Sequence, residues 1–177
     1  DQTSLPKDPK ASVASSASAF LIDIDENSEE RGTRHPVEIY LRTTPGLYWQ
    51  ENTLALLPVL GMPLRPKTRY AAVVTRDVKD TSGAPIVPSA DLDEVLGNIE
   101  ITEAHQAAVE AFAPALAELK KQKVAASTIA HLTVFTTNDP TEELFTVADA
   151  VRKDIAAPTL TSLAAKEQTA NYDAYEG

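Results

Sequence analysis

Two apolar segments in the middle of the chain constrain its fold more than any other feature. They are residues 53–59 and 69–75, both rich in β-branched or apolar side chains, and a connection with Pro and Gly joins them. The turn at 78–85 follows, in which Asp80 can bond its own backbone and Gly83 tolerates a positive φ. This order predicts an antiparallel sheet, in which we expect 53–59 and 69–75 to form a hairpin-like pair.

Three further segments have the alternation of strands. Residues 20–24 predict a short strand, 37–43 a strand with one solvated face, and 129–137 a strand dense in β-branched and aromatic residues. Pro58 should confine its strand to a sheet edge or end it, because proline cannot donate to a ladder.

Between the last two predicted strands the apolar pattern changes to a helical period. Ser89 can cap a short helix that ends near Leu96. A second helix is predicted over 103–123, with Thr102 as its cap and either a kink or a junction of two helices at Pro114. Its apolar stripe can pack on its own sheet or on a neighbouring domain, and the sequence leaves both alternatives open. The stripe consists of Ala108, Phe112, Leu116 and Leu119.

Residues 139–158 carry the clearest helical pattern. Asp139 is expected to cap this helix, Pro140 suits its first position, and Pro158 stops it. The apolar stripe consists of Leu144, Val147, Ala148, Val151 and Ile155.

Composition excludes several classes of function. A net charge of −10 argues against nucleic acid, whose phosphates need a basic surface, and no apolar run approaches the roughly 18 residues of a transmembrane segment. The chain has no cysteine, so it holds no disulfide or thiolate nucleophile. Residues 1–18, rich in Ser, Ala, Pro and Lys, predict a flexible tether. The start at Asp1 suggests that an upstream segment was removed, and the favoured interpretation is a secretory signal cleaved from a secreted protein. Residues 159–177 show no complete element and predict a linker toward a missing downstream domain.

Four motifs resemble those of bacterial Ig-like domains. They are Leu57–Val59, Pro63–Tyr70, Val78–Pro85 and Phe135–Thr137. The resemblance implies an Ig-like antiparallel β-sandwich over 19–138, but about forty residues precede the closing strand where a plain module has a short turn. We therefore expect an α+β, mainly β fold, with a helical insertion at 89–127 and a following helix.

This inserted arrangement, together with residues 19–25, 52–56 and 135–140, also resembles the N-terminal region of some large secreted bacterial lipase- or esterase-like proteins. The resemblance implies a non-catalytic accessory or scaffold module, in a secreted, cell-surface or periplasmic protein, whose partner is a downstream or associated α/β-hydrolase domain. Lipoprotein character would fit such a location. The alternative is a stand-alone envelope module for adhesion or ligand binding.

The sequence assembles no recognisable catalytic set. The six glycines never form Gly-x-Ser-x-Gly or a phosphate-binding loop, so any ester hydrolysis is expected in a downstream domain. The three histidines, His35, His105 and His131, lie far apart and give no zinc motif.

Two weak ligand sites can be named. The first is a set of alternating oxygen ligands for calcium, although a solvated acidic loop is the favoured interpretation, and Ser28 and Arg34 exclude an EF-hand. Its candidates are Asp23, Asp25, Asn27 and Glu29. The second is an aromatic platform for a sugar or a partner, for which packing within the sheet is favoured instead. Its candidates are Tyr40, Tyr48, Trp49 and Tyr70.

Overall fold

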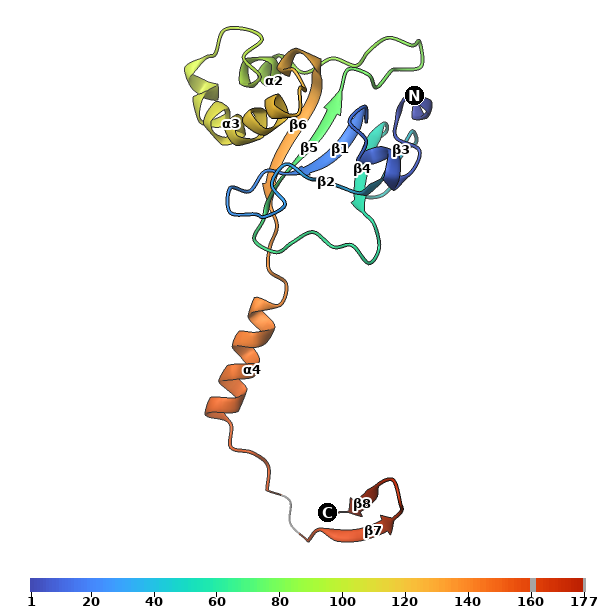
Figure 1. Cartoon of the computed structure of the whole chain (residues 1–177), viewed down its shortest axis with the longest axis vertical. Coiled ribbons are helices and arrows are strands. Elements are labelled where there is room, and N and C mark those ends of the chain that lie inside the picture. Colours follow the sequence, from blue (N-terminus) through green and yellow to red (C-terminus); the bar gives the residue numbers. More distant parts are fainter. Residues whose placement is uncertain (160–161, 177) are drawn as a thin grey trace. The chain divides into compact units, whose positions relative to one another are not determined.

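The computed structural model of the chain describes residues 1–159 and 162–176, and it divides into two compact units, Asp1–Asn138 and Asp139–Gly177 (Figure 1). The strands are β1 (Ala19–Asp23), β2 (Arg34–His35), β3 (Val37–Arg42), β4 (Thr53–Pro58), β5 (Arg69–Thr75), β6 (Ile129–Thr136), β7 (Ala164–Gln168) and β8 (Asp173–Glu176). The α-helices are α1 (Pro9–Ser12), α2 (Ala90–Val95), α3 (Gln106–Lys121) and α4 (Glu142–Asp154). The short 3₁₀ helices are η1 (Gln2–Ser4), η2 (Glu103–His105) and η3 (Ala126–Thr128).

These elements confirm an α+β chain with antiparallel sheets. Helix and strand take similar shares, 28% and 26%, so the expected predominance of strands is not found. The strands predicted at 20–24, 37–43 and 129–137 are present as β1, β3 and β6.

The first unit is built on a four-stranded antiparallel sheet with the order β2-β1-β5-β6. Strand β5 lies at its centre, where Ala71 faces Ile22 of β1 and Val73 faces Leu132 of β6. A central strand needs apolar side chains on both faces, and the run from Tyr70 to Val74 supplies them.

Helices α2 and α3 cover one face of this sheet (Figure 1). The buried side chains that meet there are Phe20, Ile22, Ala71, Val73, Leu96, Ala115, Leu119, Ile129 and Leu132, among others. Phe112 and Leu116 pack against this cluster, so the α3 stripe covers its own sheet. The alternative left open by the sequence, packing of α3 on another domain, is therefore not needed to bury this stripe.

The opposite face packs against the two-stranded sheet β3–β4. Val37 and Ile39 point inward from β3, while Tyr40 and Arg42 are exposed, as the alternation predicts. The expected pairing of 53–59 with 69–75 is wrong, because β4 pairs with β3 whereas β5 pairs with β1 and β6. The connection between β4 and β5 contains Pro63 and Pro66, and it leads the chain from one sheet to the other rather than closing a tight turn. Pro58 is the last residue of β4.

Residues 1–18 are not the flexible tether that their composition predicts. Leu5, Ser12 and Ala17 are buried, and side chains of the segment bind the outer edge of β3. Val37 N donates to Ser12 Oγ (3.0 Å) and Leu41 N donates to Gln2 Oε1 (3.3 Å). The unpaired amides of an edge strand require such partners, which is the physical reason that this polar segment is ordered.

An ion-pair cluster joins the loop after β1 to α3. Glu118, whose side chain is only 7% exposed, lies 3.2 Å from Arg31 Nε and 2.8 Å from Lys121 Nζ. Lys121 and Arg31 hold the pKa of Glu118 below its usual value through these bonds. Gly32 passes over this carboxylate with a φ of 84°, and a Cβ there would lie 2.7 Å from Glu118 Oε1. Only glycine fits that approach.

The first two predicted helices agree with the structure in part. Ser89 caps α2 by accepting from Leu92 N. Thr102 precedes η2 without a capping bond, and α3 begins only at Gln106. The helix continues through Pro114, so a junction of two helices there is wrong. Burial of Ala115 and Leu119 in the next turn offsets the hydrogen bond that proline removes.

The second unit contains α4 and a two-stranded antiparallel sheet of β7 and β8. Asp139 does not cap α4, because its carboxylate accepts from Thr141 N and Thr141 Oγ1 instead. The β7–β8 pair corrects the expectation that 159–177 has no complete element, although Leu160, Thr161 and Gly177 lie outside the described residues. Pairing of β7 with β8 decides the conformation there, where the residues of β7 have little strand propensity of their own.

Candidate functional site

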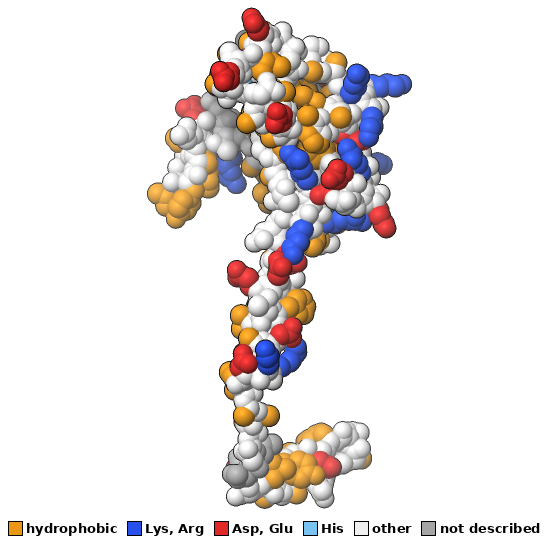
Figure 2. Space-filling model, turned by 90° about the vertical axis from the view of Figure 1, so that its left-hand side faces the viewer, with side chains coloured by type: hydrophobic (Ala, Val, Ile, Leu, Met, Phe, Trp, Pro, Cys, Tyr) orange, Lys and Arg blue, Asp and Glu red, His pale blue; other side chains and the backbone are white. Residues whose placement is uncertain are grey.

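The strongest candidate for an interaction surface is the apolar face of α4. We call it the α4 stripe and define it as Leu144, Val147, Ala148, Val151 and Ile155. These residues recur at three- and four-residue intervals, so they share one face of the helix. Leu144 is 70% exposed and Ile155 is 63% exposed. Figure 2 shows hydrophobic side chains on the surface of this helix.

Apart from Phe145, which is 66% exposed beside the α4 stripe, the rest of α4 is suited to water. Acidic residues occupy its first turn and basic residues its last turn, which complements the helix dipole. Arg152 lies 3.2 Å from Asp149 in an exposed ion pair one turn apart. The helix therefore has a polar face that is satisfied and an apolar face that no described residue of its own unit buries. Exposed apolar patches of this kind mark interaction surfaces.

The β7–β8 hairpin adds further exposed apolar side chains to the second unit. Tyr172 and Tyr175 are both more than half exposed, and Leu163 lies just before β7. An ion pair of Lys166 with Glu176 (3.1 Å) links the two strands. The second unit thus presents apolar side chains from both of its secondary-structure types.

The calcium candidates lie in the loop after β1, but their oxygen atoms accept protein hydrogen bonds. Asp23 is buried and accepts from Asp25 N (2.9 Å) and Ser28 Oγ (2.5 Å). Asp25 accepts from Asn27 N (2.9 Å) and Arg69 N (3.0 Å), and these backbone bonds lower its pKa. Glu29, the fourth candidate, follows in the same loop. Among the described residues, no group of three or more His, Asp or Glu side chains is placed to hold a metal ion.

Tyr70, one of the four aromatic candidates, lies in the core. Its ring stacks on Phe135 with centroids 6.1 Å apart, and its hydroxyl accepts from Arg65 N (3.2 Å). Burial raises the pKa of the Tyr70 hydroxyl. Tyr70 therefore does not present its ring to a ligand in solvent.

The other three aromatic candidates are exposed or half-exposed on the β3–β4 side of the first unit. Tyr40 is on β3 and donates its hydroxyl to Glu38, which raises the pKa of Tyr40. Tyr48 and Trp49 are in the loop between β3 and β4, and Arg42 Cζ lies 4.6 Å from the Trp49 ring centroid. This cation–π contact fixes Trp49 beside a positive charge.

His105 belongs to a cluster that the sequence does not reveal. Its Nδ1 lies 2.8 Å from Glu94 Oε2 and 3.2 Å from Thr102 Oγ1, and its Nε2 lies 4.0 Å from Asp91 Oδ1. Hydrogen bonds from Thr102 and His105 lower the pKa of Glu94 to about 2, while the bond to Glu94 raises the pKa of His105. Spacing alone could not have predicted it, because α2 and η2 approach only in the folded chain.

The geometry of this cluster supports structure rather than nucleophilic catalysis. Thr102 Oγ1 donates to Glu94 (2.7 Å), and both groups meet the same nitrogen of His105. In a catalytic triad the nucleophile and the carboxylate contact opposite ring nitrogens, so that the imidazole can carry a proton between them. Here the cluster joins α2 to the start of α3 and assembles no activated hydroxyl.

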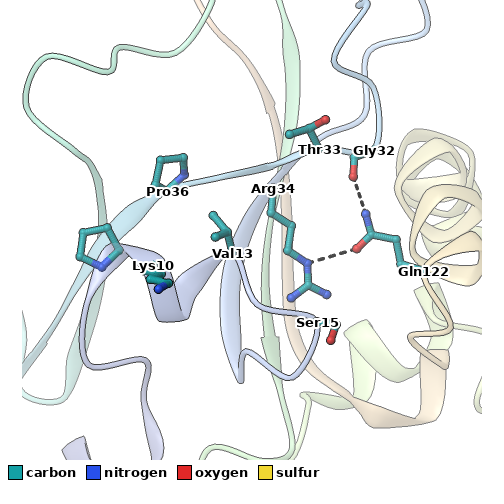
Figure 3. Close-up of a pocket in the computed structure, with 9 residues that line it drawn as sticks. Lys10, Val13, Ser15, Gly32, Thr33, Arg34, Pro36 and Gln122 are labelled. Carbon is teal, nitrogen blue, oxygen red and sulfur yellow. Dashed lines mark hydrogen bonds between the residues drawn. The ribbon is translucent and has the colours of Figure 1, made fainter.

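A pocket of about 580 Å³ lies beside β2, between α1 and the end of α3 (Figure 3). Arg34 enters it, donating from Nε to Gln122 Oε1 (3.1 Å) and from Nη1 to Ala14 O. Gln122 in turn donates to Gly32 O (2.5 Å). The Arg34 guanidinium also stacks on Phe20, with Cζ 3.6 Å from the ring centroid. No sequence pattern indicates this site, because Arg34 lies in a strand of only two residues.

A second cavity, of about 690 Å³, opens at the end of the β3–β4 layer. Its apolar lining includes Leu5, Leu41, Leu54 and Ile86. Lys79 and Asp80 lie at its polar boundary, where the Asp80 carboxylate accepts from Ser82 and Ala84. The cavity opens into the apolar core between the main sheet and β3–β4.

None of the helices within residues 1–159 and 162–176 has both the length and the apolar character needed to cross a membrane. Comparison with protein families, with curated proteins and with solved structures finds no match to this chain.

Proposed function

We propose that this chain is a non-catalytic Ig-like accessory module of a secreted or surface-attached bacterial lipase- or esterase-like protein. Its partner is the α/β-hydrolase domain of that protein, downstream or associated, and the docking surface is the α4 stripe. The exposure of the α4 stripe is the observation that carries the proposal. The motifs between Leu57 and Thr137 support the Ig-like identity, and the two facing sheets of the first unit are compatible with it.

The first unit supports this role because both faces of its main sheet are covered. The α3 stripe covers one face of the main sheet, and β3–β4 covers the other. The first unit is therefore expected to hold its shape as a scaffold. The α4 stripe, in contrast, has the pattern of a core-facing helix and lacks a core within its unit.

The α4 stripe is long and narrow, so it suits contact with one helix or one shallow groove of a partner domain. From Leu144 to Ile155 the chain rises about 16 Å along the helix axis, and at each turn the stripe is about two side chains wide. Full burial of each large apolar side chain contributes about 1.5–3 kcal/mol, from which the ordering costs of association are subtracted. Glu143 and Asp154 border the stripe on one side and Arg152 on the other, as in the polar rim of an interface.

Two measurements test the proposal. The purified chain is assayed on p-nitrophenyl butyrate, for which we expect no turnover above that of a heat-denatured control. The affinity of the chain for the α/β-hydrolase domain of the same protein is then measured by calorimetry. The same measurement is made on two variants, Val147→Asp in the α4 stripe and Thr146→Asp on the opposite face of α4. We expect Val147→Asp to abolish binding, because it places a charge in the apolar contact, and Thr146→Asp to leave it unchanged.

Either of two results contradicts the proposal. One is ester turnover that persists through purification of the 177-residue chain. The other is an affinity that Val147→Asp and Thr146→Asp reduce equally, because the interface would then not use the α4 stripe.

The exposed aromatic residues favour a second candidate, a stand-alone envelope module for adhesion or ligand binding. Tyr48 is 87% exposed, and Trp49 is held beside Arg42. Such rings suit the apolar faces of sugars. Glycan-array binding that is lost in Trp49→Ala would support this function, and an array without signal would remove its basis.

A further inference from the structure

The pocket of about 580 Å³ beside β2, which we call the Arg34 pocket, contains a guanidinium with N–H groups that make no hydrogen bond within the protein. Of its five N–H groups, Nε and one on Nη1 donate to Gln122 and Ala14, so three lack a partner among the described residues. Figure 3 shows the side chain running toward Ser15, with Val13 on one side and Gln122 on the other. The Phe20 ring and the Gln122 side chain fix the orientation of the guanidinium.

The charge of Arg34 is also uncompensated. Four of the other six arginines of the acidic chain pair with carboxylates, and the pairs are Arg31–Glu118, Arg65–Glu30, Arg76–Asp93 and Arg152–Asp149. Of the remaining two, Arg69 donates to Ala111 O and Arg42 lies over the Trp49 ring. For Arg34 no carboxylate of the described residues lies within ion-pair distance. Arg34 is half-buried, and this burial lowers the pKa of its guanidinium, which reflects the cost of partly withdrawing the cation from water. An anion in the pocket would offset that cost.

The remaining lining determines what kind of anion fits. Pro9, Val13 and Pro36 give the pocket an apolar wall, and Lys10 lies at the same opening. A fixed guanidinium fork binds carboxylates in their plane, and one principal cation matches one negative charge. An apolar wall disfavours a strongly hydrated dianion such as phosphate.

We propose that the Arg34 pocket binds the carboxylate of a small monoanionic ligand whose alkyl part lies against Val13, Pro9 and Pro36. The carboxylate can belong to a free alkyl acid or to the C-terminus of a peptide, and both present the same chemistry to Arg34. This inference goes beyond the proposed accessory function and does not depend on the α4 stripe.

The test is a titration of the full ¹⁵N-labelled chain with hexanoate, followed by amide NMR shifts. We expect saturable shifts confined to residues 9–15, 32–36 and the end of α3, with a dissociation constant below about 10 mM. Hexanamide, the neutral isostere, should produce none. A tripeptide ending in valine and its C-terminal amide form a parallel pair, and the tighter of the two carboxylates identifies the natural source.

Three variants make the test specific. Arg34→Gln should weaken binding about tenfold to a hundredfold, as expected when charge-assisted hydrogen bonds are lost. Arg42→Gln removes another arginine stacked on an aromatic ring, outside the pocket, and should bind as the wild type does. Val13→Glu places a carboxylate beside Arg34 and should compete with hexanoate, whereas Val13→Gln should not. Val13 is 36% exposed, so the last pair stays informative if Arg34→Gln fails to fold.

Three results would overturn the inference. They are shifts by hexanamide equal to those by hexanoate, undiminished binding by Val13→Glu, and the absence of saturation with both carboxylates.

Discussion

Residues 1–138 and residues 139–176 differ in how far they bury the apolar face of a helix. Both contain amphipathic helices, α3 and α4, with apolar stripes of similar length. In the first unit Leu119 of α3 is 1% exposed, whereas in the second unit Leu144 of α4 is 70% exposed. The helical pattern is therefore sufficient to specify each helix, but only the first unit supplies a surface that covers it.

The treatment of charge differs in the same way. Glu118 of α3 is buried and bonded to two cations from the loop after β1 and from its own helix. Asp149 of α4 pairs only with Arg152 one turn away, and both side chains are 76% exposed. Ion pairs of the first unit fix tertiary structure, while those of α4 stabilise one helix. This contrast is what a scaffold with a separate docking helix would show.

The largest change in the free energy of unfolding is expected from one member of a matched pair of leucine truncations. Leu119→Ala should lower the free energy of unfolding by about 2–5 kcal/mol, because it leaves a cavity in the packed core. Leu144→Ala should change it by less than about 0.5 kcal/mol, since the side chain is in water in both states. Guanidinium denaturation of the whole chain measures both. Equal losses would break the contrast between the two units.

A second pair of variants compares the buried ion pairs of Glu118 with the exposed ion pair of Asp149 and Arg152. Glu118→Gln should cost about 1–3 kcal/mol, because Arg31 and Lys121 lose a charged acceptor at a buried site. Asp149→Asn should cost at most about 0.5 kcal/mol. The pKa of Glu118 is lower in the folded than in the unfolded state, so its contribution is present above pH 4.5 and is lost as the pH falls through the folded pKa. Urea denaturation at pH 7 and pH 3.5 should show the difference between wild type and Glu118→Gln shrinking at the lower pH.

The Glu94–His105 pair should make the stability of the first unit, and not that of the second, depend on pH. The raised pKa of His105 gives stability that is fully present below pH 6.5 and is lost as the pH rises through the folded pKa. Glu94 acts in the opposite direction, and its contribution is lost as the pH falls from 4.5 toward about 2. In thermal melts, His105→Gln should be destabilised more at pH 5.5 than at pH 8.5. A deficit independent of pH would show that protonation of His105 is unimportant.

The smallest effect concerns the single tryptophan. A Cβ at Gly46 would lie 2.4 Å from Trp49 Cε2, so Gly46→Ala should displace the ring from Arg42. Because Trp49 is the only tryptophan, its fluorescence should shift to the red while the free energy of unfolding changes by less than about 0.5 kcal/mol. The control is Gly61→Ala, which strains the backbone because φ is 84° there, but whose Cβ meets no atom within 4 Å, so the emission should stay as in the wild type.

Sequence patterns predicted elements well and partners poorly. The strand at 69–75 was recognisable because a run from Tyr70 to Val74 has the composition of a strand. Its neighbours were not, because pairing with β1 and β6 depends on residues about fifty positions away on either side. The same limit applies to Tyr70, for which the sequence leaves a ligand platform and packing within the sheet as alternatives, and the position of β5 buries its ring.

The candidate sites divide along the same line. The α4 stripe is a local repeat, and its five residues were named from the period alone. Arg34, Gln122 and Ala14 come together from β2, the end of α3 and the segment after α1, so no spacing relates them. The prediction of a flexible tether at 1–18 is wrong for a similar reason, since Ser12 and Gln2 are ordered by amides of β3, which lies farther along the chain.

Apart from the β7–β8 pair, the sequence by itself determined where most backbone elements form, the amphipathic character of α3 and α4, and the absence of cysteine chemistry. Short-range sterics, capping and side-chain period fix these properties within a few residues. The tertiary structure alone decided that β4 pairs with β3 and not with β5, and that the α3 stripe is covered whereas no described residue of the second unit covers the α4 stripe. It also decided that Arg34 lines a pocket whose described lining residues include no carboxylate. Those outcomes depend on which distant surfaces meet, and burial energy rather than local pattern selects them.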